Sequence, residues 1–235
     1  DCQMLIKDAE KINKDTNMHG GRIVHFCNDS SFKFLIKASK NWKNFIYKLN
    51  TETFFNKCLD ELNLGSKNFK FVHHYKKNHS EINFIYRELN KKELRFLNSF
   101  TIIKYLLYRI FYSFIDFLYL RIKYFNSYPV ELLYEYSCAR GGYKRIIHRD
   151  SDDRIIVCLI YLNSMSKETK GGDLKMYKYN KNTKKYPAEP KESDCTLIKS
   201  IKPLEGRMVI LQNNSQCFHS VDEIKKITNS RHYIL

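Results

Sequence analysis

The spacing of hydrophobic residues changes near residue 130, and this change constrains the fold more than any other feature of the sequence. Before it, apolar residues recur at helical spacing, most clearly from Asn41 to Leu64. After it, short runs rich in β-branched and aromatic residues alternate with turn clusters such as Gly171-Gly172-Asp173. The sequence therefore predicts a helical first part followed by a β-rich second part.

In the first part, the run from Asn41 to Leu64 predicts two amphipathic helices that meet near Asn50. Thr51 is expected to cap the second helix and Gly65 to end it, since these residue types favour those two positions. The segment 94–125 is apolar and aromatic, but charged residues interrupt it. It predicts a buried or interfacial helix rather than one that spans a membrane.

In the second part, six short runs are predicted to be strands, and no helical pattern separates them. They cover residues 132–136, 155–162, 174–179, 195–201, 207–211 and 231–235. Such a series is typical of an antiparallel sandwich or barrel. We therefore predict an α+β fold in which a helical N-terminal lobe, residues 1–130, packs on a β core, residues 131–235. The sequence ends within the last predicted strand, so we expect that strand to be cut short.

Composition narrows the class of protein. The net charge of +16 comes from 41 basic and 25 acidic residues, and the excess is spread over both parts of the chain. This spread indicates a compositional bias and argues against a nucleic-acid partner. No apolar stretch of about 18 residues is present, which argues against an integral membrane protein. The seven cysteines form no C-x-x-C pair, and no secretory signal is evident, so the expected compartment is the cytoplasm.

Three residues of the β-rich part form a candidate metal site. His148 and Asp150 are two positions apart, so on a strand or its edge their side chains point to the same face. His219 follows a predicted strand and its turn, and it is the candidate third ligand. Two histidines and one carboxylate on one face of an octahedron are the Fe(II) arrangement of oxygen-activating enzymes.

Arg231 is a candidate binding residue for an anion. It lies in the last predicted strand, twelve positions after His219. An arginine inside a small barrel needs an anionic partner, because a lone buried charge is very costly. A carboxylate matches the planar guanidinium group best.

Over about residues 131–235 the sequence resembles the 2-oxoglutarate and Fe(II)-dependent dioxygenases, specifically their prolyl 4-hydroxylase-like branch. Five motifs in the family's order carry the resemblance, which makes it more specific than any one of them. They are Tyr136 with Gly141-Gly142-Tyr143 and His148-Arg149-Asp150, then Ile160-Tyr161-Leu162-Asn163, Gly171-Gly172-Asp173-Leu174, Pro203-Leu204-Glu205-Gly206-Arg207, and finally His219-Ser220-Val221 with Arg231.

The resemblance implies a double-stranded β-helix (jelly-roll) core and a role for each of these residues. His148, Asp150 and His219 are expected to bind Fe(II), and no catalytic residue is expected beyond this metal centre. Arg231 is expected to bind the distal carboxylate of 2-oxoglutarate, with a hydrogen bond from Tyr161 to the same co-substrate, and Tyr136 is expected to line the pocket. The implied reaction hydroxylates a substrate C–H bond with O2, releasing succinate and CO2, with ascorbate as reductant.

Two alternatives stay open at this point. One is an alkylation-repair-type nucleic-acid demethylase with the same iron site, motivated by the net charge of +16. The other is a non-catalytic β-barrel binding module that contacts membranes peripherally through segment 94–125. The substrate of the dioxygenase is open as well, and both peptidyl and small-molecule substrates are compatible with the sequence.

Overall fold

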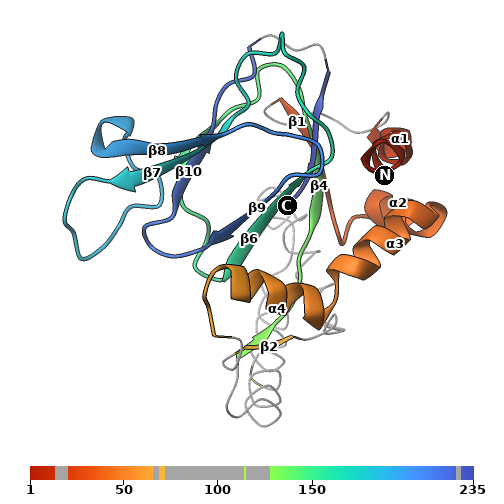
Figure 1. Cartoon of the computed structure of the whole chain (residues 1–235), viewed down its shortest axis with the longest axis horizontal. Helices are drawn as coiled ribbons and strands as arrows, with labels where there is room; N and C mark the ends of the chain where they lie inside the picture. The colour runs from red at the N-terminus through yellow and green to blue at the C-terminus, as the bar shows by residue number, and fades with distance from the viewer. Residues whose placement is uncertain (14–20, 66–68, 72–113, 115–127, 226–228) are drawn as a thin grey trace, which may run out of the picture. The chain divides into compact units, whose positions relative to one another are not determined.

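The computed structural model describes residues 1–13, 21–65, 69–71, 114, 128–225 and 229–235 (Figure 1). The chain divides into two compact units. The first consists of Asp1–Leu49, Glu61–Asn63 and Leu133–Leu235, and the second of Asn50–Asp60 and Leu64–Leu132. The first unit contains every residue that the sequence predicts for the site. The predicted division near residue 130 stays a prediction. In the structure, Asp1–Leu49 belong to the same compact unit as the β-rich residues Leu133–Leu235.

Two antiparallel sheets form the β-rich part of the first unit. The larger has the strand order β1-β4-β11-β6-β9, and the smaller has the order β5-β10-β7-β8. The larger sheet consists of β1 (Arg22–Phe26), β4 (Glu135–Ala139), β11 (Arg231–Ile234), β6 (Ile156–Tyr161) and β9 (Met208–Gln212). The smaller consists of β5 (Arg145–His148), β10 (Phe218–Val221), β7 (Leu174–Tyr179) and β8 (Cys195–Ile201), with a short 3-10 helix, Glu192–Asp194, before β8. The predicted antiparallel β structure with helices is confirmed.

A shared hydrophobic core lies between the two sheets. Leu159 and Tyr161 from the larger sheet and Leu174 and Val221 from the smaller belong to one buried cluster. Side chains alternate between the two faces of a strand, so Val157, Leu159 and Tyr161 mark the inner face of β6. The inner face of the larger sheet is the one that carries the predicted site residues Tyr161 and Arg231.

Three helices cover the outer face of the larger sheet (Figure 1). They are α1 (Cys2–Asn13), α2 (Ser30–Ala38) and α3 (Lys40–Leu49). Their apolar side chains pack on Ile23, Tyr136 and Ile234 of the sheet. At the centre of this layer, Trp42 is fully buried and donates its indole N–H to the carbonyl of Leu5 at 2.7 Å. The helices therefore hold the sheet from outside and leave its inner face to the site.

Three strands of this unit were not predicted. β1 lies in the part of the chain expected to be helical, and it pairs with β4, more than a hundred residues later. β5 and β10 are only four residues long and contain arginine or histidine. Strands this short give no clear period-two pattern, and pairing partners far apart in sequence leave no local signal.

The second unit contains most of α4 (Glu52–Glu61) and the parallel pair β2 (Phe69–Phe71) and β3 (Tyr128–Val130). The predicted cap of α4 is confirmed, since Thr51 Oγ1 accepts the backbone N–H of Phe54 at 3.1 Å. The prediction that Gly65 ends the helix is wrong. The left-handed residue is Asn63, with φ of 53°, and the Leu64 N–H bonds back to the Leu59 carbonyl.

Two other expectations concern membranes and cysteines. None of the helices in the described ranges is both long and apolar enough to cross a bilayer. The predicted helix over 94–125 lies outside the described residues, apart from Phe114. All seven cysteines are thiols rather than disulfides, which agrees with the absence of a paired cysteine pattern in the sequence.

Candidate metal centre and co-substrate pocket

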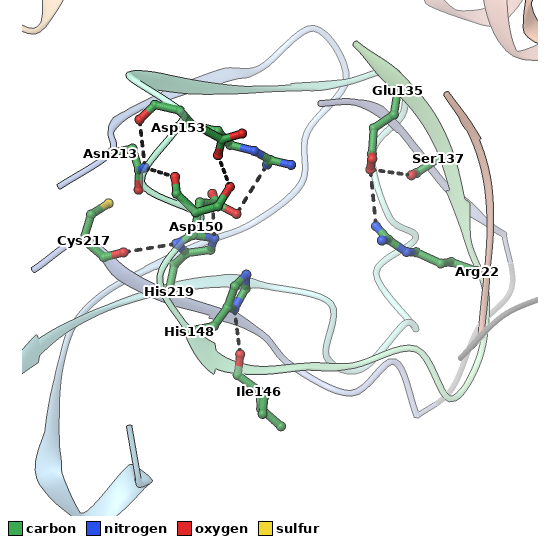
Figure 2. A network of polar contacts seen from close by, with 12 residues as sticks. Arg22, Glu135, Ser137, Ile146, His148, Asp150, Asp153, Asn213, Cys217 and His219 are labelled. Carbon is green, nitrogen blue, oxygen red and sulfur yellow. Dashed lines mark hydrogen bonds and ion pairs between the residues drawn. The ribbon is translucent and has the colours of Figure 1, made fainter. Parts of the chain in front are cut away.

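His148, Asp150 and His219 converge at one end of the smaller sheet (Figure 2). His148 ends β5, and the strand pairing places His219 of β10 directly opposite it. The two imidazole ring centroids are 4.4 Å apart, and His219 Nε2 lies 3.7 Å from Asp150 Oδ2. One potential ligand atom from each residue lies within 4.8 Å of the other two, so the three predicted residues come together as a candidate metal site.

The hydrogen bonds of the two imidazoles fix which nitrogen faces this site. His148 Nδ1 donates to the carbonyl of Ile146 at 2.9 Å, and His219 Nδ1 approaches the carbonyl of Cys217 at 3.4 Å (Figure 2). In both cases the acceptor lies two residues earlier in the chain, Ile146 within β5 and Cys217 directly before β10. A carbonyl only accepts, so each Nδ1 carries the proton and each Nε2 presents a lone pair to a metal.

The loop that carries Asp150 is fixed from several sides. Asn213, which follows β9, donates its amide to the carbonyls of Ser151 and Arg154 at 2.8 and 2.9 Å. Arg154 lies 3.4 Å from Asp150 Oδ1, while Oδ2 is the oxygen nearer to His219. No role was predicted for Asn213 from the sequence.

The electrostatics keep both histidines in the form that binds a metal. Burial lowers the pKa of His148. Burial, followed by the charge of His148, lowers the pKa of His219 to about 4, and Asp150 opposes this shift only in part. Both rings are therefore neutral near pH 7. Two neutral imidazoles and one carboxylate fit Fe(II) and leave the remaining coordination positions open.

Arg231 and Tyr161 form a second polar site, on the inner face of the larger sheet. Arg231 is fully buried, and its Nη1 donates to the carbonyl of Gly172 at 2.6 Å. Its Nε and the Tyr161 hydroxyl are buried without a hydrogen-bond partner among the described residues. No carboxylate in the described ranges forms an ion pair with Arg231. A buried cation without an anionic partner is costly, so Arg231 and the Tyr161 hydroxyl together fit an anionic ligand such as the carboxylate of 2-oxoglutarate.

Two motifs of the sequence hold Arg231 in place. The Asn163 amide donates to the Ser230 carbonyl at 2.7 Å, and its oxygen accepts the His232 N–H at 2.9 Å. Asn163 thus clamps the backbone on both sides of Arg231. Gly172 supplies the carbonyl that accepts from the guanidinium group. The sequence identified both motifs by resemblance, but not these contacts.

Tyr136 does not line the pocket, and this expectation is wrong. Its ring is fully buried among the helices on the outer face of the larger sheet. Its hydroxyl contacts the Asn13 amide at 3.2 Å and His232 Nδ1 at 2.7 Å. The inner face of β4 instead carries Glu135, Ser137 and Ala139. A shift of one residue along a strand moves a side chain to the opposite face, so sequence matching alone placed Tyr136 on the wrong side.

Comparison with known proteins agrees with this site. Residues 133–234 match the family described as the 2OG-Fe(II) oxygenase superfamily. No curated protein sequence matches the chain. Residues 133–234 therefore resemble the 2OG-Fe(II) oxygenases, a family of iron- and 2-oxoglutarate-dependent dioxygenases.

Two solved structures are similar to the chain at low identity. One is a Pseudomonas putida prolyl-4-hydroxylase, with 18% identity, a TM-score of 0.30, and coverage of 43% of this chain and 45% of the other. The other is a prolyl hydroxylase in complex with a hypoxia inducible factor oxygen degradation domain peptide fragment from Trichoplax adhaerens. It has 17% identity, a TM-score of 0.32, and coverage of 99% of this chain and 90% of the other. The chain thus spans less than half of the Pseudomonas protein.

Proposed function

We propose that the chain is an Fe(II)- and 2-oxoglutarate-dependent hydroxylase of a substrate C–H bond. The observation that carries this proposal is the convergence of His148, Asp150 and His219 within 4.8 Å, in a domain of the matching family. Bound Fe(II) with 2-oxoglutarate and O2 supplies the oxidising chemistry, and succinate and CO2 are the expected co-products. The same convergence argues against a non-catalytic binding module, which has no use for such a cluster.

We also propose that the β core is a double-stranded β-helix. The eight strands from β4 to β11 divide equally between the two sheets. The first, third, sixth and eighth of them lie in the larger sheet, and the other four lie in the smaller one. This alternation, with a shared core between the sheets, supports a jelly-roll arrangement.

The protein's own residues bind and orient the reactants. The two imidazole Nε2 atoms and the Asp150 carboxylate hold the metal in a fixed geometry. Arg231 and the Tyr161 hydroxyl bind the distal carboxylate of 2-oxoglutarate, which orients its other end. Both groups are fully buried, so water is excluded around this carboxylate and the ionic interaction is strong.

Succinate release tests the proposal. Anaerobically iron-loaded protein is mixed with 2-oxoglutarate and O2, and we expect succinate only when both Fe(II) and 2-oxoglutarate are present. His148→Ala and Asp150→Ala should abolish it. Asp152→Asn is the matched control, because this carboxylate lies two residues from Asp150 but is 81% exposed and pairs with Arg149. Wild-type protein that neither binds nor consumes 2-oxoglutarate would overturn the proposal.

The substrate class, peptidyl or small molecule, and the use of ascorbate stay predictions. A screen of peptide and metabolite libraries, with succinate as the readout, is expected to find substrates that raise succinate release above the uncoupled level. Addition of ascorbate to the same assay tests its role as a reductant. Oligonucleotides belong in the screen, because the nucleic-acid alternative predicts binding that weakens steeply with salt.

A further inference from the structure

The N-terminal strand β1 brings a second arginine to the inner face of the larger sheet. Arg22 pairs in register with Ala139, and on the other side of β4 the same Ala139 pairs with Arg231. Ile23 and His25 of β1 belong to the outer, helix-covered face. Arg22 therefore shares the inner face with Arg231, although it lies outside residues 133–234 that define the family.

Arg22 and Arg231 both contact the side chains of Tyr143 and Tyr233. Arg22 Nη1 donates to the Tyr233 hydroxyl at 3.1 Å, and the Arg231 guanidinium carbon lies 4.7 Å from the centroid of the Tyr233 ring. The two guanidinium carbons lie 5.6 and 5.5 Å from the ring centroid of Tyr143. Arg231 also lies 5.8 Å from the ring centroid of Tyr161, so two of its three tyrosine neighbours, Tyr143 and Tyr233, contact Arg22 as well.

Arg22, Arg231 and Glu135 together carry two positive charges and at most one negative charge, so an additional anion would balance them. Arg22 has one carboxylate nearby, that of Glu135, at 3.4 Å, and Ser137 donates to the same carboxylate (Figure 2). Arg231 has none in the part of the chain that the structure describes. Burial raises the pKa of Glu135, which weakens it as a counter-ion. Burial alone would raise the pKa of Tyr233. The positive charges of Arg231 and Arg22 outweigh this effect, so the pKa of Tyr233 lies below its ordinary value.

We propose that Arg22 is a positioning residue of the 2-oxoglutarate pocket, because its bond to Tyr233 fixes the aromatic wall against which Arg231 packs. The inference rests on the proposed binding of 2-oxoglutarate by Arg231. It means that the pocket is completed by β1, outside the region that carries the family's motifs. Removal of Arg22 leaves the metal ligands in place but lets Tyr233, and with it Arg231, move away from the position that binds the co-substrate.

The test measures 2-oxoglutarate binding by calorimetry on the full chain loaded with Mn(II). Arg22→Met keeps the length of the side chain and removes its charge and donors. We expect it to weaken 2-oxoglutarate binding about tenfold, the usual size of a lost charge-assisted hydrogen bond, with Mn(II) affinity unchanged. Arg22→Lys should restore most of the affinity. Val24→Ala, a change on the same strand that removes no charge, is the control for loosening of β1.

A second variant isolates the contact with Tyr233. Tyr233→Phe keeps the ring and removes the hydroxyl that bonds both Arg22 and Tyr143, so it should weaken 2-oxoglutarate binding at least as much as Arg22→Met does. The double variant should bind 2-oxoglutarate no more weakly than Tyr233→Phe alone, because the contact between Arg22 and Tyr233 is already lost in that variant. Tyr233→Phe also serves if Arg22→Met does not fold.

An independent readout is the alkaline titration of tyrosine absorption. The difference between wild type and Tyr233→Phe reports the ionisation of Tyr233, and Arg22→Met should shift it to higher pH. Unchanged 2-oxoglutarate affinity in Arg22→Met or Tyr233→Phe overturns the inference and leaves the proposed function intact. Wild-type protein that binds Mn(II) but not 2-oxoglutarate overturns the proposed function, and the inference with it.

Discussion

At the scale of single residues, Tyr161 and Arg231 show how buried polar atoms without partners point to a ligand. The Tyr161 hydroxyl is buried away from water, and it has no hydrogen-bond partner among the described residues. Leaving such a group unpaired costs about 1–3 kcal/mol, so a fold retains it only where something compensates. Binding of a carboxylate beside Arg231 compensates for both residues at once.

Tyr161→Phe should therefore have opposite effects on stability and on binding. Without 2-oxoglutarate, the variant should be as stable as wild type or more stable by up to about 1 kcal/mol, because the unpaired hydroxyl is gone. Its affinity for 2-oxoglutarate should fall about fivefold to tenfold, the value of one hydrogen bond. Chemical denaturation and calorimetry measure the two effects. A large loss of stability, or unchanged affinity, would contradict the role of Tyr161.

The site residues differ in how far sequence could predict them. His148, Asp150 and His219 were predictable because these residue types suit an Fe(II) site and because the order of the family's motifs picks out the three positions. Tyr136 was placed on the wrong face, because resemblance fixes a motif but not the register that decides which way a side chain points. Arg22 was not found at all, since its partner strand lies more than a hundred residues away.

At the scale of elements, the turn at Gly171 and Gly172 links the fold to the pocket. Both residues have positive φ, of 82° and 81°. A Cβ on Gly171 would lie 1.8 Å from the carbonyl oxygen of Glu223, so no other residue fits without a backbone shift. The next carbonyl, that of Gly172, accepts from Arg231. The turn therefore sets the position of an acceptor inside the pocket.

Gly171→Ala should lower both the free energy of unfolding and the affinity for 2-oxoglutarate. The positive φ alone costs about 1 kcal/mol, and the clash with Glu223 adds to it, so we expect a loss of about 2–4 kcal/mol. Gly206→Ala is the matched control, because Gly206 also has positive φ, of 75°, but nothing lies within 4 Å of its Cβ position. It should lose about 1 kcal/mol. Equal losses in the two variants would refute the packing argument.

The elements that sequence could predict are those with a clear local pattern. The helices α3 and α4 and six of the strands follow from spacing and turn residues. The short strands β5 and β10, which carry two of the metal ligands, do not, because four residues are too few to show a period. Their position depends on pairing in the smaller sheet, which is a property of the whole fold.

At the scale of the whole molecule, a buried polar chain joins the helical layer to the larger sheet. His25 contacts Ser31 and Asn13, and Asn13 contacts Tyr136, which bonds to His232. Burial lowers the pKa of His25, and it lowers the pKa of His232 to about 4. Both rings are therefore neutral in the folded protein near pH 7. Protonation of these rings at acid pH would disturb the hydrogen bonds between the helical layer and the larger sheet.

The metal-free protein should lose stability as the pH falls from about 6.5 to 4. In this window the unfolded chain binds a proton at His232 that the folded chain does not, so unfolding is favoured by about 1.4 kcal/mol per pH unit for this residue. Denaturation at several pH values measures the slope. His232→Gln removes the titrating group and keeps a hydrogen-bond acceptor for Tyr136, so its slope should be shallower by about one proton. An unchanged slope would show that His232 is not the group responsible.

The cytoplasmic location stays a prediction, and the site uses only a few of the basic residues that give the net charge of +16. What the site requires is the simultaneous binding of Fe(II) and 2-oxoglutarate. An anaerobic titration followed by visible absorption measures this directly, because 2-oxoglutarate bound to Fe(II) gives a metal-to-ligand charge-transfer band. We predict a band that needs both components, saturates at one iron per chain and is lost in Asp150→Ala. No band in wild-type protein, or a band that persists in Asp150→Ala, would contradict the proposed centre.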